Sequence, residues 1–484
     1  MADEVDDVRL FEVGEAGEAE RVRAVAGRAK VFRSYDQRQV FLLPPSLDDW
    51  LPDGHTARFV SEVVDDMLDL SAVYASYTNK TGAPPFDPRM MLKLVVYAYS
   101  TGVTSSREIE RRCQVDVAFR WLSANTAPDY RSVSRFRRRH LAALDDLFGQ
   151  VLVLCANAGL VKLGRVALDG TKLEASASKH TAMSYGRLVT RIFEVEAEVA
   201  RMLAEAEAID AAEDAEFGAD RRGDELPAEL RTREGRLAKM REAKAAIEAE
   251  AAERAAADAA DKARAAGNND DDIAAAASEA ARLATPRAKT QRSFTDPDAR
   301  MMKTNRGFVY AYNAQAAADE FSQVILAGYL TQAPTDINQL LAMLKRINLA
   351  LAAAGLGSPK RTLADAGYCS TANLDQAADT GHDVLIATGR LKHNEKVPDA
   401  PRGRIPNNAT TRERMARRLR TKQGRADYAR RKAIIEPVFG QMKVRQNAGQ
   451  LRLRGLAGAQ GEFTLHAICH NLRKLANATQ PATC

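Results

Sequence analysis

The sequence is poor in cysteine and has no long apolar run. Its cysteines are scattered and odd in number, and they lie at positions 113, 155, 369, 469 and 484. No Cys-x-x-Cys pair or tight Cys/His group occurs, so a disulfide framework or a structural zinc site is not expected. No apolar stretch approaches the roughly 20 residues that span a bilayer, and the acidic, Ala-rich start differs from a signal peptide. We expect a protein of the reducing cytoplasm with no membrane partner.

The composition is that of a globular protein with a small basic excess. Of 484 residues, 28% are charged and 45% are hydrophobic, and 70 Lys and Arg against 64 Asp and Glu give a net charge of +6. This length suggests about three domains. Between positions 402 and 432 only Glu413 and Asp427 are acidic, so this basic segment is a candidate nucleic-acid contact. Its expected DNA-binding residues are Arg417, Arg418 and Arg420.

Residues 1–30 are expected to form a flexible acidic leader, and 31–150 a helical DNA-binding domain. Asp87 and Pro88 precede an apolar stretch and predict a helix start. A second helix is expected from Ser105 or Ser106, and Ser132 is expected to begin a short Arg-rich one. Short helices that end in an Arg-rich helix are typical of helix-turn-helix modules. The expected DNA contacts here are Arg131, Arg135, Arg137, Arg138 and Arg139; the alternative is a solvated helix that pairs with acidic residues elsewhere.

From residue 151 onward the pattern alternates between strands and helices. Strands are expected at 165–169, 307–319, 322–330, 361–365 and 383–389, and helices at 335–354 and 371–380. This order predicts an α/β domain, 151–186 and 287–477, with a mixed sheet flanked by helices. An Ala-, Glu- and Arg-rich insertion, 187–286, is expected to form two or three long surface helices that pack antiparallel. Residues 478–484 form the tail.

Two of these strands end in aspartate, at Asp169 and Asp365, and each is followed by a small-residue turn. If the strands are neighbours, the carboxylates meet at one end of the sheet and could hold a divalent ion. Glu436, beside the basic segment, would complete a two-metal site for phosphoryl transfer. The alternative is that each aspartate is an ordinary turn or cap residue. Pro437 predicts that a helix starts or kinks at Glu436.

Lys443 lies two helical turns after Glu436, so both side chains share a helix face. It would bind phosphate beside the metal, or belong to a solvated helix face. His466 and His470 have a spacing that suits a metal, but their apolar surroundings favour packing or surface roles.

Ordered blocks over residues 31–477 resemble the DDE transposases of bacterial insertion sequences, most closely the group numbered eleven-eighty-two. The blocks include RSVSRFRRRH, VALDGTKLEASAS, LADAGYCSTANL, IIEPVFGQMK and LHAICHNLRKL. The resemblance implies a ribonuclease-H-like core in which Asp169, Asp365 and Glu436 are the catalytic residues and bind two Mg²⁺, or Mn²⁺ in their place.

The same resemblance assigns residues that hold phosphate or DNA near the metals. Tyr428, Arg431, Glu436 and Lys443 match the order of a Tyr-Arg-Glu-Lys signature, although the Arg-to-Glu gap is one residue longer than in the best-known relatives. Lys172, in the block of Asp169, is expected to act with them.

The expected function is a transposase that cuts DNA at terminal inverted repeats and joins the 3′-OH ends to target DNA. It is expected to act as a homodimer or higher oligomer on double-stranded DNA, in the bacterial cytoplasm at the nucleoid. The alternative is a non-enzymatic DNA-binding protein, a regulator or inactive transposase that holds element ends. A coiled-coil scaffold is disfavoured because 187–285 lacks sustained apolar heptads.

Overall fold

The computed structural model describes residues 46–78, 84–177, 182–217, 228–304, 307–389, 399 and 402–479. The expected leader 1–30 and the first part of the expected helical domain, 31–45, lie outside these residues. The chain divides into two units, 1–49 and 50–484. In the first unit the described residues are 46–49, the start of the short helix α2 (Leu47–Trp50). All elements below belong to the second unit.

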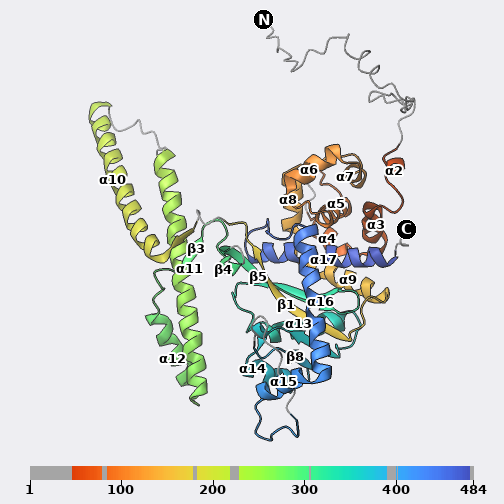
Figure 1. The fold of residues 1–484 in the computed structure, drawn as a ribbon. Helices are drawn as coiled ribbons and strands as arrows, with labels where there is room; N and C mark the ends of the chain where they lie inside the picture. Colours follow the sequence, from red (N-terminus) through yellow and green to blue (C-terminus); the bar gives the residue numbers. More distant parts are fainter. Residues whose placement is uncertain are drawn as a thin grey trace, which may run out of the picture. The chain divides into compact units, whose positions relative to one another are not determined.

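The described residues form a six-stranded mixed sheet with the order β4-β5-β1-β7-β8, and β6 also pairs with β5 (Figure 1). Its strands are β1 (Arg165–Glu174), β4 (Arg300–Thr304), β5 (Gly307–Asp319), β6 (Ile325–Thr331), β7 (Arg361–Ala364) and β8 (Val384–Ile386). The pairs β1–β7 and β7–β8 are parallel, and the pairs of β5 with β1, β4 and β6 are antiparallel. The expected mixed sheet is therefore confirmed; β4 is an additional strand.

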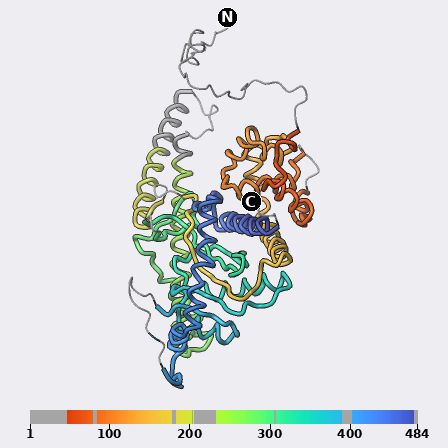
Figure 2. The backbone as a smooth tube through the Cα atoms, turned by 45° about the vertical axis from the view of Figure 1, so that its right-hand side comes forward, coloured from red at the N-terminus to blue at the C-terminus, as the bar shows by residue number. Residues whose placement is uncertain are grey.

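Small side chains let helices approach the middle of this sheet closely. Strand β5 is buried over most of its length and is rich in alanine. A Cβ added to Gly328 of β6 would lie 2.9 Å from the ring of Phe463 on α17. The helices of this part are α13 (Leu340–Ala353), η3 (Ala366–Tyr368), α14 (Thr371–Asp379), α15 (Thr411–Arg420), α16 (Lys422–Arg445) and α17 (Leu456–Thr479). Helix α16 packs against β1, as both views show (Figures 1 and 2).

Short helices precede the sheet and share its hydrophobic core. They are α3 (Thr56–Glu62), η1 (Val63–Met67), α4 (Ser71–Ala75), α5 (Pro88–Ser100), α6 (Ser106–Val115), α7 (Val117–Leu122), α8 (Tyr130–Arg139) and α9 (Leu141–Asn157). Asp87 caps α5 and Pro88 is its first residue, as expected. Helix α8 starts earlier than expected, because the Asp129 side chain accepts from the backbone of Arg131 and Ser132. Helix α9 continues through the domain boundary expected at residue 150.

The insertion holds three long described helices and has a small core of its own. These are α10 (Tyr185–Phe217), α11 (Ala228–Ala265) and α12 (Asp270–Leu283). Leu188, Ile192 and Val195 of α10 pack with Leu237 and Met240 of α11 in a cluster separate from the main core. At the base, β2 (Ala182–Ser184) pairs antiparallel with β3 (Gln291–Ser293), so the chain enters and leaves the insertion at adjacent points.

Helix α16 continues through Pro437, so a helix start at Glu436 is wrong, whereas the kink expected as the alternative stays a prediction. Proline has no N–H to offer the carbonyl one turn earlier, which belongs to Ala433. The Gln323 side chain donates to that carbonyl at 2.9 Å instead. The lost hydrogen bond is thus replaced from outside the helix, and Glu436 lies within a continuous helix rather than at its start.

Candidate active site

Asp169 and Asp365 lie side by side because their strands are parallel neighbours. Strand β1 pairs with β7 in a register that aligns Ala167 with Leu363, and two residues further along each strand come the two aspartates. Each carboxylate has one oxygen fixed by backbone: Asp169 accepts from the Gly170 N–H, and Asp365 from the Gly367 N–H, both at 2.8 Å. The expectation that the two strands are neighbours is confirmed.

The charges around Asp169 oppose one another. Burial raises the pKa of Asp169, and the nearby carboxylate of Asp365 raises it further, whereas the Arg431 guanidinium lowers it. Two carboxylates crowded in this way repel each other, and hard oxygen donors in such a pair are what a divalent cation prefers. The residues present at the strand ends therefore fit a metal such as Mg²⁺.

Helix α16 brings the other expected residues over the same face of β1. Arg431 Nη1 lies 2.8 Å from Asp169 Oδ2, and its Nη2 lies 4.0 Å from Glu436 Oε1. Lys443 donates to the Thr171 hydroxyl at 2.6 Å. Tyr428 is half-buried, and burial raises its pKa. Alternate residues of β1 point the same way, which is why Asp169 and Thr171 both face this helix.

Glu436 does not touch the aspartate pair directly. Its side chain is 55% exposed, and the guanidinium of Arg431 lies between it and Asp169. Accordingly, no group of three or more His, Cys, Asp or Glu residues able to hold a metal occurs in the described part of the chain. The structure brings Asp169, Asp365 and Arg431 together and leaves Glu436 one side chain away. Arg431 Nε is buried without a hydrogen-bond partner among the described residues.

A further carboxylate, Asp336, lies on the other face of β1 and was missed by the sequence analysis. Lys172 Nζ is 3.7 Å from Asp336 Oδ1. Burial lowers the pKa of Lys172, and the charge of Asp336 opposes this shift. Asp336 belongs to a loop without periodicity, so no local pattern marks it. A usable signal was the pair Asn313 and Gln315, two amides within an otherwise alanine-rich buried strand.

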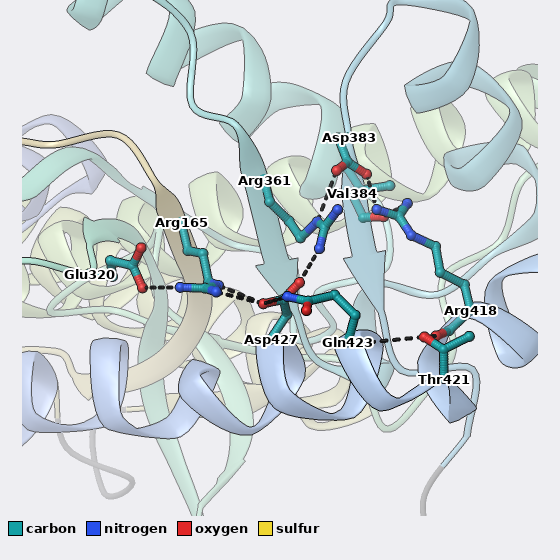
Figure 3. Close-up of polar contacts among 10 residues, drawn as sticks. Arg165, Glu320, Arg361, Asp383, Val384, Arg418, Thr421, Gln423 and Asp427 are labelled. Atoms are coloured by element: carbon teal, nitrogen blue, oxygen red, sulfur yellow. Dashed lines mark hydrogen bonds and ion pairs between the residues drawn. The ribbon is translucent and has the colours of Figure 1, made fainter. Parts of the chain in front are cut away.

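An ion-pair network anchors α16 at the opposite end of the two parallel strands (Figure 3). Asp427 of α16 is buried, and it pairs with Arg165 and Arg361, the first residues of β1 and β7. Arg165 also pairs with Glu320, and Arg361 with Asp383. Odd-numbered residues of β1 from Arg165 to Thr171 share one face of the strand. The ion pairs of Asp427 therefore fix α16, with Arg431 and Lys443, over the face that carries Asp169.

Of the three arginines expected to bind DNA from the basic segment, two are engaged within the protein. Arg418 pairs with Asp383 and donates to the Val384 carbonyl, so it belongs to the network of Figure 3. Arg417 donates to the Gly403 carbonyl. Arg420 is half-buried near the end of α15. The Arg418 guanidinium attaches α15 to the sheet, and its contact with DNA stays a prediction.

The Arg-rich helix α8 divides into two faces. Arg131, Arg135, Arg138 and Arg139 are exposed, as a DNA-contacting surface requires. Arg137 is only 7% exposed, and it donates to the Tyr99 hydroxyl at 2.6 Å and to the Thr104 carbonyl at 2.8 Å. The expectation that Arg137 contacts DNA is therefore wrong. Its position follows from helix geometry, since it lies one turn after the buried Val133.

His466 and His470 are buried on α17 and pack within the core, as the sequence favoured. His466 lies against the Tyr99 ring with 4.9 Å between centroids, and His470 Nε2 lies 2.8 Å from the Gln323 carbonyl oxygen. Burial lowers the pKa of His466 to about 3 and that of His470 to about 4.

The fold and the site define an α/β protein whose mixed sheet presents paired carboxylates at the ends of neighbouring strands, beneath a basic helix. Comparison with protein families is more specific. Residues 283–472 match the family described as Transposase DDE domain, and residues 45–139 match the Transposase domain (DUF772). Two segments of the chain are therefore similar to transposase domains, which is consistent with a DDE transposase of insertion sequences.

These matches support transposase activity in general and imply a ribonuclease-H-like fold. The DDE match contains Asp365 and Glu436, whereas Asp169 lies between the two matched segments. No curated protein and no solved structure matches the chain. None of the described helices is long and apolar enough to cross a membrane. The finer likeness to the group numbered eleven-eighty-two stays a prediction.

Proposed function

We propose that this protein is a DNA transposase that cuts the ends of its element and joins the freed 3′-OH groups to target DNA. The observation that carries the proposal is the parallel register that aligns Asp169 with Asp365, under a helix bearing Arg431, Glu436 and Lys443. Paired carboxylates with nearby cations are what phosphoryl transfer requires, because the carboxylates hold metal and the cations hold phosphate.

Asp169, Asp365 and Glu436 are the proposed metal ligands, with Mg²⁺ or Mn²⁺ as the ion. When bound, such ions stabilise the negative charge that develops on the transferring phosphate. Glu436 is the ligand that has to approach, and its exposure leaves it free to do so. For metal to replace the charge of Arg431 beside Asp169, the guanidinium has to turn away. The five N–H donors of the released guanidinium then suit phosphate oxygens.

Lys443 and Tyr428 complete the phosphate contacts. The Thr171 hydroxyl accepts from Lys443 and holds the ammonium on the side of β1 that carries Asp169. A lysine held in this way offers a fixed positive charge to a DNA backbone. Tyr428 lies on α16 near Arg431, where its hydroxyl can donate to the same phosphate.

Recognition of the element ends is proposed for the exposed face of α8, with Arg131, Arg135, Arg138 and Arg139. Exposed arginines on one helix form the kind of surface that binds DNA phosphates and bases. Assembly as a homodimer or higher oligomer on DNA, and a nucleoid location, stay predictions from the sequence.

The test is a cleavage assay on labelled duplex DNA that carries the sequences flanking the gene. The parent protein with Mg²⁺ is expected to nick one defined 3′ end, and EDTA, Asp169→Asn and Glu436→Gln are each expected to abolish nicking. Asp379→Asn is the matched control, since Asp379 is an exposed aspartate at the end of α14. Tight binding of the DNA without cleavage under any divalent metal would instead favour a non-enzymatic protein that holds element ends.

A further inference from the structure

Asp336, in the loop between β6 and α13, is held by two buried amides of β5. Asn313 Nδ2 and Gln315 Nε2 both donate to Asp336 Oδ1 at 2.7 Å. Both amide side chains are fully buried, and the side-chain oxygen Oε1 of Gln315 accepts from the Tyr368 hydroxyl. A carboxylate that receives two such bonds has a well-defined orientation. The loop is thereby tied to the centre of the sheet.

This carboxylate lies between the two segments that carry the candidate catalytic aspartates. A Cβ added to Gly170, directly after Asp169, would lie 2.6 Å from Asp336 Oδ1. A Cβ added to Gly367, two residues after Asp365, would lie 3.5 Å from Asp336 Oδ2. The absence of a side chain at Gly170 is what makes room for the carboxylate, whereas a Cβ at Gly367 would be in ordinary van der Waals contact with it.

Lys172 is the cation that Asp336 faces. On β1 Gly170 and Lys172 lie on one face of the strand, paired with Gln315 and Asn313 of β5. The Lys172 side chain is 18% exposed, and its Nζ lies 3.7 Å from Asp336 Oδ1. The charges of Asp169 and Asp365 also act on this ammonium. Because the β1–β7 pairing ends at Ala167, Asp169 and Lys172 both lie on the part of β1 that β7 leaves open, and Asp365 directly follows the end of β7.

We propose that Asp336 is a positioning residue for strand cleavage, which holds the Lys172 ammonium beside Asp169 and Asp365 so that it contacts the scissile phosphate. A lysine has four rotatable bonds, and without a fixed acceptor its charge is spread over many positions. An ammonium placed in advance stabilises charge on the phosphate without reorganisation during the reaction. The inference rests on the proposed function, since it assigns a role within the same site.

The pair Asp336→Asn and Asp336→Ala separates charge from hydrogen bonding. Asparagine keeps an oxygen for the two amide donors but removes the charge that attracts Lys172, whereas alanine removes both. We expect Asp336→Asn to unfold at the parent's temperature and to cleave DNA about tenfold more slowly at unchanged KM. The double variant Asp336→Asn/Lys172→Gln is expected to be no slower than Lys172→Gln alone, because Asp336 acts through Lys172.

A second measurement tests the contact between Asp336 and Lys172 and does not depend on DNA cleavage. The rate at which an amine-reactive ester modifies Lys172, followed by mass spectrometry, is expected to rise several-fold in Asp336→Asn and to stay unchanged in the control Asp379→Asn. Unchanged Lys172 modification in Asp336→Asn overturns the inference even if the protein cleaves no DNA.

Three kinetic results also contradict it. Parent-like cleavage by Asp336→Asn reduces Asp336 to a hydrogen-bond acceptor. If the rate losses of the two single variants multiply in the double variant, Asp336 acts independently of Lys172. If Asp336→Asn needs more Mg²⁺ for cleavage while Lys172 modification is unchanged, the Asp336 carboxylate is a metal ligand instead. If Asp169→Asn also cleaves like the parent, the proposed function fails, which is a separate outcome.

Discussion

Asp427 is the residue whose replacement tests most directly what holds α16 on the sheet. Its side chain is 1% exposed. It accepts from Arg165 Nε at 2.9 Å and Nη2 at 2.6 Å, from Arg361, and from Gln423 at 2.9 Å. Burial alone would raise the pKa of Asp427, but the hydrogen bonds and charges of these partners hold it below its ordinary value. The carboxylate is therefore charged and fully paired at neutral pH.

Asp427→Asn preserves the shape of the side chain and removes its charge. Removal of one partner from a buried ion pair costs about 3–5 kcal/mol. Arg165 keeps Glu320 at 2.8 Å and Arg361 keeps Asp383 at 2.9 Å, so neither arginine is left without a carboxylate. We therefore expect the low end, a loss of about 3 kcal/mol in the free energy of unfolding.

The assay is urea unfolding at pH 7, followed by circular dichroism. Asp383→Asn is the matched control, because Asp383 belongs to the same network but is 33% exposed, and its loss is expected to cost about 1 kcal/mol or less. If Asp427→Asn is no more destabilising than Asp383→Asn, burial of the network does not determine its strength, and the account of how α16 is anchored is refuted.

Three further predictions follow from other contacts. His466 and His470 are neutral in the folded protein, so below pH 6.5 the unfolded chain binds more protons than the folded one. The free energy of unfolding is therefore expected to fall by about 4 kcal/mol between pH 7 and pH 5. His470→Gln is expected to halve this fall, measured by unfolding at a series of pH values. Replacement of the exposed Arg135 by Gln is expected to lower the salt slope of DNA binding by about 1, whereas Arg137→Lys lowers the unfolding temperature instead. Thr171→Val is expected to slow cleavage about tenfold with unchanged stability, since it removes the acceptor that holds Lys443; parent-like rates would exclude that role.

Local sequence patterns were sufficient to predict most elements of the sheet. The alternation in VALD and the short apolar run in RTLAD predicted the strands that end near Asp169 and Asp365, and the parallel register confirmed that they are neighbours. The helix cap at Asp87 was predicted as well, because the relevant hydrogen bond spans only a few residues. The three helices of the insertion followed from their Ala-rich composition.

Contacts between distant segments were not predictable in this way. Asp336 reaches the site only through amides of another strand, and Gln323 replaces the hydrogen bond lost at Pro437 from more than one hundred positions away. Arg137 is different: its spacing from Val133 already placed it on the buried face of α8, but the density of arginines suggested a uniformly exposed helix.

The insertion with its own core has a consequence for how the protein reaches its native state. Strands β1 and β5 have to pair across roughly 130 residues, a long loop whose closure is entropically unfavourable. The insertion folds through local contacts, and the pairing of β2 with β3 brings its two ends together. Once the two ends are joined, the effective loop between β1 and β5 falls to roughly 25 residues. The free-energy cost of closing this loop is then lower by roughly 1.5 kcal/mol. Because α10–α12 are synthesised before β5, this helical arm can form early and shorten the search that assembles the sheet.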